Sequence, residues 1–430
     1  MEQIGALQGG QLRREAAGGP GFAGVRRTGL VVSWHVIASV AGSRVHRGIR
    51  AEYRAEADII EFPPLGPGAA GRFGDRDSGG TNGPGRTGRF AVWWREESGV
   101  REGGAMNTSF VPPSRGMLTE CVGSAVHAPS LHNSQPWLFR IRRPAIEVYA
   151  DPTRSLPVVD PDGRELLISV GAAVFTLRTA LRRAGYDSDC ELLPDPGRPT
   201  LAARVTATRV RPVDATIEAL AAAIPYRHTD RRPFAQVPVP PDRLGRLRDA
   251  ARREGAVLTN ADQAGRDAVL DLARAADRWL RDQPEYRQEL DHWTDHRRRH
   301  DGVPVWAAGP WDALELVPLR DFAALSPVRR EVEPFEPYPT IGLLSTAGDT
   351  PRDWLRAGQA LQRVLLTATW QGLATMPISQ PVEVPAMRKA LAGRAAGRFP
   401  QIVLRVGYGR VQMPGATPRR SVSEVLIQTG

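Results

Sequence analysis

Hydrophobic positions first settle into regular periods near residue 117. The run MLTECVGSAVHA, residues 117–128, places its apolar side chains on one face of a helix. Residues 138–151 alternate as a pair of strands does, on either side of an Arg-Pro turn. A helix is predicted for 171–185 and a strand for 201–210. Together these elements predict a unit of mixed helices and strands.

A second long helix is predicted between Thr350 and Gly372. Thr350 is a favoured N-cap residue, Pro351 suits the first helical position, and Asp353 completes a pattern like a capping box. Apolar residues occupy several sides of this helix. The pattern therefore predicts a buried helix in the centre of the fold.

The two long helices share a spacing. Gly171 and Gly185 are 14 positions apart, and so are Gly358 and Gly372. A loop with proline and then a strand follow each helix, the second strand at 399–409. This order predicts an α+β fold of two similar halves, in which each sheet packs with helices around the long central helices. We place the halves at residues 106–222 and 223–430, with the boundary near 221–226.

Residues 1–105 show no such periods. They hold 22 of the 43 glycines, so about half of the glycine lies in a quarter of the chain. We expect little packed structure in this N-terminal extension. Two interpretations fit it. It is a disordered basic arm, or an upstream reading of a ribosome-binding site, because REGGAM back-translates to a purine-rich stretch before Met106; the true start is then Met106 or Met117.

The net charge of +10 suggests nucleic acid at first sight. However, Lys389 is the only lysine, and the arginines are spread along the chain among acidic residues without a nucleic-acid motif. Two cysteines make neither a disulfide framework nor a zinc site. No run is long and apolar enough to span a bilayer. We expect a cytoplasmic protein that binds neither nucleic acid nor membrane.

Three segments carry candidate chemistry. APSLHNSQPW, residues 128–137, offers short polar groups between two prolines and is either a turn after the first helix or a wall of a cofactor pocket; a serine hydrolase is disfavoured because no G-x-S-x-G elbow occurs. YRHTDRRPF, residues 226–234, alternates two arginines with a threonine, which suits a phosphate, although a solvated loop also fits. TPRRSVSEVL, residues 417–426, has a basic pair and is otherwise an exposed tail.

Together these segments resemble the flavin-binding nitroreductase family. The resemblance lies in P-S-x-x-N-x-Q-P-W before an alternating strand, in R-x-S/T-x-R/K before a Pro-rich helix entry, in WQGLATMPIS after the long helix, and in a closing G-Y-G strand end followed by a basic pair. These motifs occur in order over about 310 residues. Because the first motif occurs only in the first half and the arginine motif only in the second, the chain is similar to the tandem, Acg-like branch.

The resemblance implies one FMN site in a fused pseudo-dimer that acts as a monomer. Four residues would serve the ribityl phosphate: Arg227, Thr229, Arg419 and Arg420. Arg231 would lie near the flavin N1–C2 carbonyl, where positive charge stabilises the reduced flavin. The ring would be contacted by Pro129, Ser130, Asn133, Gln135, Pro377, Ile378 and Ser379. The family often has an acid near this last position, and Ser379 and Gln380 stand there instead.

Two functions follow from the resemblance. The first is an FMN-dependent oxidoreductase that uses NAD(P)H and passes hydride or electrons to a small acceptor such as a quinone or a nitroaromatic, with the flavin and no side chain as the catalytic group. The second is a protein that sequesters flavin without turnover. The replaced acid and a predicted lid favour the second. A basic nucleic-acid-binding arm is a third interpretation and depends only on residues 1–105.

Residues 284–338 fit neither half. The segment contains Trp293, Trp306 and Trp311. In the family, insertions at this point cover the flavin, so we expect a lid, although a peripheral excursion that buries its own tryptophans also fits. Three histidines at helical spacing suggest a zinc site, but three arginines crowd the same turn and no H-E-x-x-H occurs. We therefore expect no metal at His292, His296 and His300.

Overall fold

The computed structural model describes residues 110–295, 300–322, 330–410 and 417–428. Contacts divide the chain into two units, Met1–Ala70 and Gly71–Gly430, and all described residues belong to the second. The predicted N-terminal extension and His296 of the rejected zinc site lie outside the described residues. The fold is therefore that of the second unit alone.

The first half is a four-stranded antiparallel sheet covered by helices. Its strand order is β1-β2-β4-β3, and the hairpin around Arg143–Pro144 is present as predicted. Its elements are α1 (Arg115–Ala125), β1 (Trp137–Arg142), β2 (Ala145–Ala150), α2 (Arg164–Arg183), β3 (Tyr186–Leu192), β4 (Leu201–Val210) and α3 (Ala215–Ala223). Helix α2 begins earlier than the predicted Gly171, because the Asp160 carboxylate accepts from the N–H groups of Glu165 and Leu166 and caps a polar first turn.

The second half repeats this plan. Its strand order, β11-β12-β10-β5, is the order of the first sheet once the strands are matched along the chain. Its elements are α4 (Pro241–Arg253), β5 (Val257–Asn260), β10 (Thr340–Thr346), α7 (Pro351–Trp370), β11 (Ala374–Ile378), α8 (Gln380–Glu383), α9 (Pro385–Ala392) and β12 (Phe399–Gly407). In each half the long helix joins the second and third strands. The α+β fold of two similar halves is confirmed.

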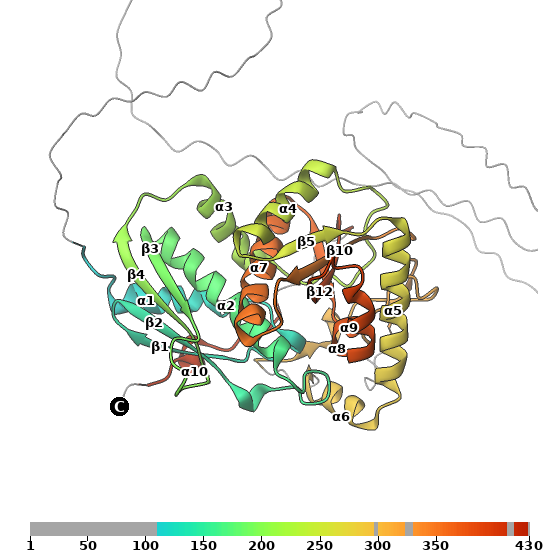
Figure 1. The fold of residues 1–430 in the computed structure, drawn as a ribbon, viewed down its shortest axis with the longest axis horizontal. Coiled ribbons are helices and arrows are strands. Elements are labelled where there is room, and N and C mark those ends of the chain that lie inside the picture. The colour runs from blue at the N-terminus through green and yellow to red at the C-terminus, as the bar shows by residue number, and fades with distance from the viewer. Residues whose placement is uncertain (1–109, 296–299, 323–329, 411–416, 429–430) are drawn as a thin grey trace, which may run out of the picture. The chain divides into compact units, whose positions relative to one another are not determined.

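Helices α2 and α7 lie together between the two sheets (Figure 1). Helix α7 begins at the predicted capping box of Thr350 and Asp353. Two of the four glycines that define the repeat, Gly171 and Gly358, lie at the crossing, because a Cβ on Gly171 would fall 3.1 Å from the Cα of Gly358. Backbones can approach this closely only where side chains are absent.

The two halves exchange arms. After α3, the arm at residues 227–235 joins the second sheet: Asp230 N–H donates to Thr375 O at 3.0 Å, and Ala235 N–H donates to Tyr408 O at 2.8 Å. After β12, a tail with helix α10 (Val422–Val425) returns to the first sheet, where the Ile427 N–H donates to Phe139 O at 2.8 Å. The segment that follows the last strand of each sheet, after α3 in the first case, therefore extends the other sheet.

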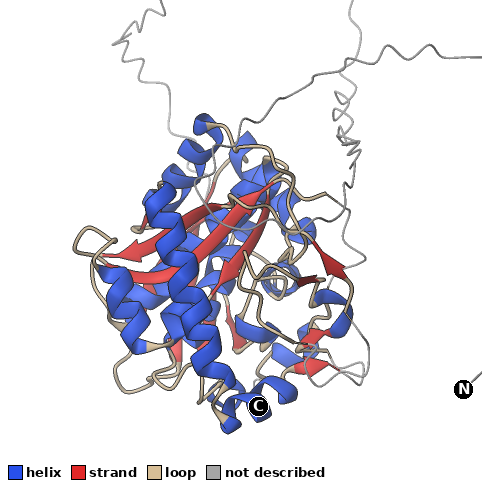
Figure 2. Cartoon of the chain, turned by 90° about the vertical axis from the view of Figure 1, so that its right-hand side faces the viewer, coloured by secondary structure: helices blue, strands red, loops and turns tan. Residues whose placement is uncertain are grey.

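The connection between β5 and β10 differs most between the halves, because residues 261–339 replace the tight hairpin of β1 and β2. This stretch contains α5 (Gln263–Arg281), α6 (Pro284–His292), β6 (Thr294–Asp295), β7 (Val303–Pro304), β8 (Trp311–Asp312) and β9 (Val332–Glu333). Helix α5 packs Val269, Leu270 and Ala273 against the second sheet, and Figure 2 shows it in front of the strands. The predicted lid, 284–338, falls within this stretch.

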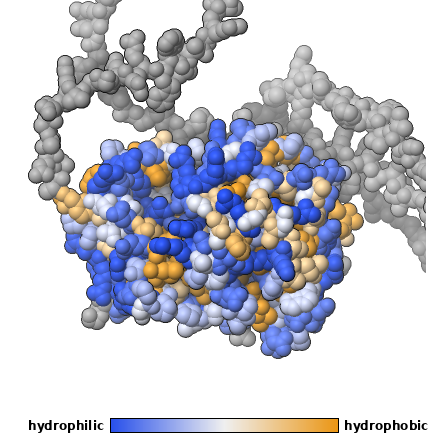
Figure 3. Space-filling model, viewed as in Figure 1, coloured by the Kyte–Doolittle hydropathy of each residue, from blue (hydrophilic) through white to orange (hydrophobic). Residues whose placement is uncertain are grey.

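The surface of the described unit is mainly hydrophilic on the face shown in Figure 3, with hydrophobic residues in small separate areas. None of the helices in the described ranges is long and apolar enough to cross a membrane. Within the same ranges, no group of three His, Cys, Asp or Glu side chains is placed to hold a metal ion.

Candidate functional site

A cavity lies where the two halves meet. It encloses about 810 Å³ of space that atoms do not fill, open solvent at its mouth included. Helices α2 and α7 contribute Ile168, Ala172 and Leu361 to its wall. Six of the predicted site residues also line it: Pro129, Ser130, Thr229, Arg231, Pro377 and Ser379.

The loop at residues 128–137 is held in a demanding backbone conformation. His132, Asn133 and Gln135 have positive φ values of 48°, 55° and 51°, which residues other than glycine adopt at a cost. The Ser130 hydroxyl accepts from the Gln135 N–H at 2.9 Å and fixes the turn. The Ser169 hydroxyl on α2 accepts from the Leu131 N–H at 3.1 Å and ties the loop to the central helix.

The side-chain amides of Asn133 and Gln135 form hydrogen bonds with neighbouring backbone groups. Asn133 Nδ2 donates to Gly302 O at 2.9 Å and to Pro418 O at 3.1 Å. Gln135 Nε2 donates to His300 O at 2.8 Å, and its Oε1 accepts from the Arg420 N–H at 2.8 Å. The two amides thus join the loop to the insertion and to the C-terminal tail. Neither residue lines the cavity.

Arg420 and Ile378 also lie behind the cavity wall. The Arg420 guanidinium donates to Gln135 O at 3.1 Å and to Glu424 O at 2.9 Å, so it holds the tail in place. Ile378 is 1% exposed and packs in the core of the second sheet. The structure therefore does not bring these two side chains to the cavity that the other predicted residues share.

Arg227 is buried and Arg419 is half-buried near it, and neither side chain lines the cavity. Arg227 donates to His127 O at 3.2 Å, and Arg419 donates to Asn133 Oδ1 at 3.0 Å. The Nε atom of each has no hydrogen-bond partner, and neither guanidinium forms an ion pair with any described residue. Burial and then the charge of Arg419 lower the pKa of Arg227 to about 9, and burial lowers the pKa of Arg419 to about 10. This pair of cations calls for an anion.

Arg231 of the arm contacts the insertion. Its Nη1 donates to Ala307 O at 3.0 Å, and its guanidinium lies 4.9 Å from the centre of the Phe322 ring. Gly309 permits this approach, because a Cβ there would fall 2.6 Å from Arg231 O. Burial first, and then Arg320 and Arg330, lower the pKa of Arg231 to about 10. The residue offers positive charge to whatever fills the cavity.

His132 lines the cavity although the sequence did not single it out. It is 5% exposed, meets the Phe322 ring edge to face at 5.2 Å, and leaves both ring nitrogens without a hydrogen-bond partner. Burial, Arg320 and Arg231 hold its pKa well below the ordinary value, so the imidazole is neutral. Its place between polar loop residues was visible in the sequence, but its burial was not.

The insertion supplies the opposite wall with Pro318, Leu319, Arg320 and Phe322. Arg320 Nη2 donates to both carboxylate oxygens of Glu383 at 2.5 and 2.6 Å and to the Ser379 hydroxyl at 3.2 Å. A second missed residue, Glu165 of α2, also lines the cavity. Its sequence signal was only that of an ordinary acid in the first turn of a helix.

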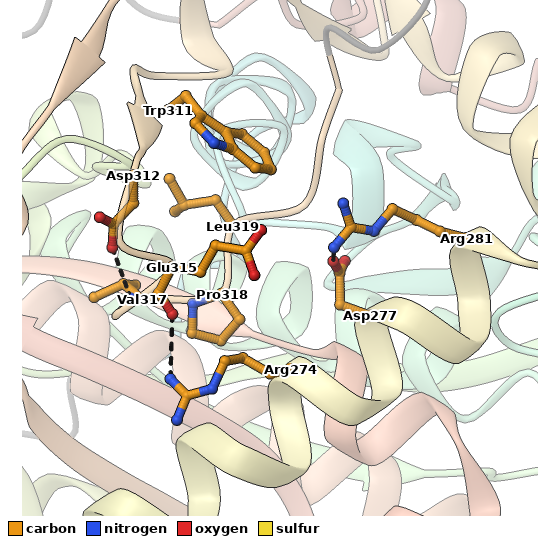
Figure 4. A pocket seen from close by; sticks show the side chains of 9 residues that line it. All are labelled: Arg274, Asp277, Arg281, Trp311, Asp312, Glu315, Val317, Pro318 and Leu319. Atoms are coloured by element: carbon orange, nitrogen blue, oxygen red, sulfur yellow. Dashed lines mark hydrogen bonds and ion pairs between the residues drawn. The ribbon is translucent and has the colours of Figure 1, made fainter.

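A smaller pocket lies on the other side of Pro318 and Leu319 and encloses about 320 Å³, open solvent included (Figure 4). Its arginines are already engaged: Arg281 pairs with Asp277 at 2.6 Å, and Arg274 donates to Glu315 O at 3.2 Å. The larger cavity, which Arg231 lines without an ion pair to any described residue, is therefore the better candidate for a ligand site.

No family model matches the chain. Curated proteins do match. A protein of Mycobacterium tuberculosis strain H37Rv with the provisional name NAD(P)H nitroreductase Rv3131 is 36% identical over 327 residues, which cover 75% of this chain and 94% of that protein. A second protein of the same strain, provisionally named NAD(P)H nitroreductase acg, is 32% identical over 333 residues, 73% of this chain and 97% of its own length.

Solved structures of nitroreductases match parts of the chain. NfnB from Mycobacterium smegmatis, crystallised with NADPH, has a TM-score of 0.32 at 15% identity and covers 50% of this chain and 99% of its own. An FMN-bound nitroreductase from Bacteroides fragilis has a TM-score of 0.29 at 14% identity over 48% and 94% of the two chains. The assignment rests on the sequence relatives, which cover nearly their whole lengths. The chain belongs to the nitroreductase family, in its Acg-like branch.

Proposed function

We propose that the chain is an FMN-dependent oxidoreductase that takes electrons from NAD(P)H and reduces a small acceptor of the quinone or nitroaromatic class. One observation carries the proposal: Arg227 and Arg419, which form no ion pair with any described residue, lie at the junction of the two arms, and Thr229 and Arg231 of the same arm line the cavity. Membership of the nitroreductase family supports it, and the provisional names of its relatives support NAD(P)H as the reductant.

The arginine pair fits a phosphate. A buried guanidinium without a carboxylate, such as that of Arg227, costs several kcal/mol through lost hydration, and a phosphate returns that energy through charge-assisted hydrogen bonds. The free Nε atoms of Arg227 and Arg419 are donors that need an acceptor. Thr229, which lies on the same arm and lines the cavity, adds a hydroxyl. We assign the ribityl phosphate to these three residues and keep Arg420 as the residue that holds the tail.

The wall residues fit a flat ring. Pro129 and Pro377 are rigid apolar surfaces, and Ser130 and Ser379 supply small polar groups at its edges. Bound FMN would supply hydride transfer. Arg231 would stabilise the negative charge that a reduced flavin carries near N1. Asn133, Gln135 and Ile378 would act indirectly, by holding the loop and the strand that carry the wall.

We further propose that residues 284–338 act as a lid on a single site and that the fused halves work as a monomer. Pro318, Leu319, Arg320 and Phe322 of this segment contribute to the cavity wall, which supports a covering role. The return of the tail from the second half, residues 223–430, to the sheet of the first half, residues 106–222, supports an intramolecular pseudo-dimer.

Flavin sequestration without turnover is the second candidate. Ser379 and Gln380 replace the acid that the family often has near the ring, and the insertion contributes residues to the cavity wall. Both features hinder a reductant more than they hinder the flavin. This candidate predicts the same bound FMN and differs only in reactivity.

One experiment separates the two. The full chain is purified, its absorbance is recorded, and it is then mixed anaerobically with NADPH or NADH. Yellow protein that bleaches and recovers its colour with a quinone supports the enzyme. Yellow protein that stays oxidised supports sequestration. Colourless protein that takes up no FMN eliminates both, because each requires the phosphate at Arg227 and Arg419.

A further inference from the structure

Glu165 places a buried carboxyl group in the cavity wall. The residue lies in the first turn of α2, its side chain is 4% exposed, and it lines the cavity that we assign to the flavin. Its Oε1 accepts from Arg164 Nη2 at 2.6 Å. Its Oε2 accepts no hydrogen bond from any residue that the structure describes. One oxygen is thus free for a ligand.

Carboxyl groups outnumber guanidinium groups around Glu165. Two further carboxyl groups act on it, Asp160 before α2 and Glu383 of α8, and two guanidiniums balance them, Arg164 of α2 and Arg320 of the insertion. Arg320 is occupied by both oxygens of Glu383. Three buried carboxyl groups against two cations leave one charge unpaired, and a proton removes that charge at the least cost.

Arg164 offsets only part of this excess of negative charge, because its guanidinium also donates to other acceptors. Its Nη1 donates to Gln401 O at 2.8 Å, and its Nη2 also donates to Val382 O at 3.2 Å. Both oxygens of Asp160 accept from the N–H groups that begin α2, so that carboxyl is already committed. Burial raises the pKa of Glu165 well above its ordinary range; Arg164 opposes this shift, and Glu383 and Asp160 add to it.

We propose that Glu165 is the acid of this site and donates a proton to the acceptor. The inference rests on the proposed function, in which reduced flavin supplies the hydride. Hydride delivers two electrons and one hydrogen to a quinone, and negative charge develops on its oxygen. The O–H bond of Glu165 breaks as the new O–H bond forms on that oxygen, which gives the hydroquinone and a carboxylate beside Arg164. Water then returns a proton to Glu165.

This assignment accounts for the replaced acid at Ser379. The carboxyl group has moved from the loop after β11 to the first turn of α2, on another wall of the same cavity. An acid placed there is expected to contribute about 10²-fold or more to the protonation step. A hydride donor alone does not need it, so the step that depends on Glu165 is reoxidation by the acceptor.

The test compares Glu165→Gln and Glu165→Asp with wild type in the flavin-loaded full chain. Reduction by NADPH and reoxidation by a benzoquinone are followed separately by stopped flow. Glu165→Gln, which keeps the shape and the Arg164 contact, is expected to slow reoxidation by about 10²-fold with little change in reduction, and Glu165→Asp to recover part of the rate. Equal reoxidation by wild type and Glu165→Gln overturns the inference. Wild type that is never reduced or reoxidised overturns the proposed function first.

A second readout needs neither flavin nor turnover. A protonated buried carboxyl has a carbonyl stretch in the infrared that a carboxylate lacks. The flavin-free full chain is expected to show this band at pH 7 in wild type and in a control, Glu147→Gln, and to lose it in Glu165→Gln. Glu147 is a suitable control because, despite burial, the Tyr149 hydrogen bond, Arg198 and Arg204 lower its pKa. No band in wild type, or an unchanged band in Glu165→Gln, overturns the inference even for a working enzyme.

Discussion

Gly171 and Gly358 lie against each other's helices at the centre of the molecule. A Cβ on Gly171 would fall 2.2 Å from Leu355 O, and one on Gly358 would fall 2.0 Å from Ile168 O. Both contacts are with backbone oxygens, which cannot move aside without moving the helix. Ile168 and Ala172 of α2 and Leu361 of α7, which lie within three residues of these glycines, also line the cavity, so a shift of the two helices would displace part of its wall.

Gly171→Ala and Gly358→Ala should each destabilise the protein severely. Separation of two packed helices exceeds ordinary overpacking, so we expect a loss of about 3 kcal/mol or more in the free energy of unfolding, measured by urea denaturation. Gly245→Ala is the matched control, since a Cβ there meets only the flexible Arg248 side chain at 3.7 Å within helix α4. It should stabilise the protein by about 0.5–1 kcal/mol. Similar effects at all three glycines would refute the close crossing.

Arg227→Met should stabilise the flavin-free protein and abolish its response to phosphate. The substitution removes a buried cation that no described carboxylate neutralises, and we expect a gain of about 1–4 kcal/mol. In wild type, FMN at 100 times its Kd should add about 2.7 kcal/mol. Thermal melting with and without FMN or inorganic phosphate measures both effects.

Arg209→Met is the control for this experiment. Arg209 is 74% exposed at its side chain and pairs with Asp187 on the first sheet, away from the cavity. Its loss should leave both the melting temperature and the FMN response nearly unchanged. A flavin-free Arg227→Met protein that is less stable than wild type would mean that Arg227 serves the fold and not an anion.

The flavin-free protein should lose stability as the pH falls below about 6.5. His132 is neutral in the folded state because burial, Arg320 and Arg231 lower its pKa, whereas in the unfolded chain it takes up a proton near pH 6.5. Below that pH the unfolded state binds the extra proton and is favoured, by at most about 1.4 kcal/mol per pH unit for this residue. His127, whose pKa burial, Arg419 and Arg227 also lower, adds to the slope.

His132→Asn should flatten this dependence between pH 6.5 and 5. Asparagine tolerates the positive φ of 48° and does not titrate. Urea denaturation at several pH values supplies the comparison. An unchanged slope in His132→Asn would show that this imidazole is not held neutral.

The buried Arg405–Glu336 pair should be costly to break. Arg405 is fully buried, donates to both oxygens of Glu336 at 2.6 Å, and stacks at 3.6 Å from the centre of the Phe234 ring. Arg405→Met leaves the carboxylate unpaired and should cost about 3–5 kcal/mol. Adding Glu336→Gln to Arg405→Met should recover part of this loss. If the double variant is no more stable than the single one, the pair is not coupled.

The elements were predictable where one local signal decided them. A pattern of a few residues is enough to predict each of three features: the capping box at Thr350, the matched glycines and the Arg143–Pro144 hairpin. The exchange of arms was not predictable, because it depends on contacts between residues far apart, such as Ile427 with Phe139.

The cavity wall was predictable only in part. Ser130 and Thr229 belong to motifs with distinctive spacing, so they were found. Glu165 and His132 could be recognised as site residues only from their burial in the structure. An acid in the first turn of a helix and a histidine in a polar loop are ordinary in a sequence, where burial cannot be seen. Asn133 belongs to the same motif as Ser130 but holds the loop and does not line the cavity. Only its hydrogen bonds in the structure show this difference.

The connection at residues 261–339 occurs once, between β5 and β10, while the matching strands of the first half are joined by a tight hairpin. In an assembly of two identical chains, every inserted segment and every substitution is present twice, so one wall of a shared site cannot change without its copy. Here a mutation alters one half only. The wall carried by the insertion and the loop wall carried by the first half can therefore vary independently, and selectivity for a ligand can change on one side while the other stays constant.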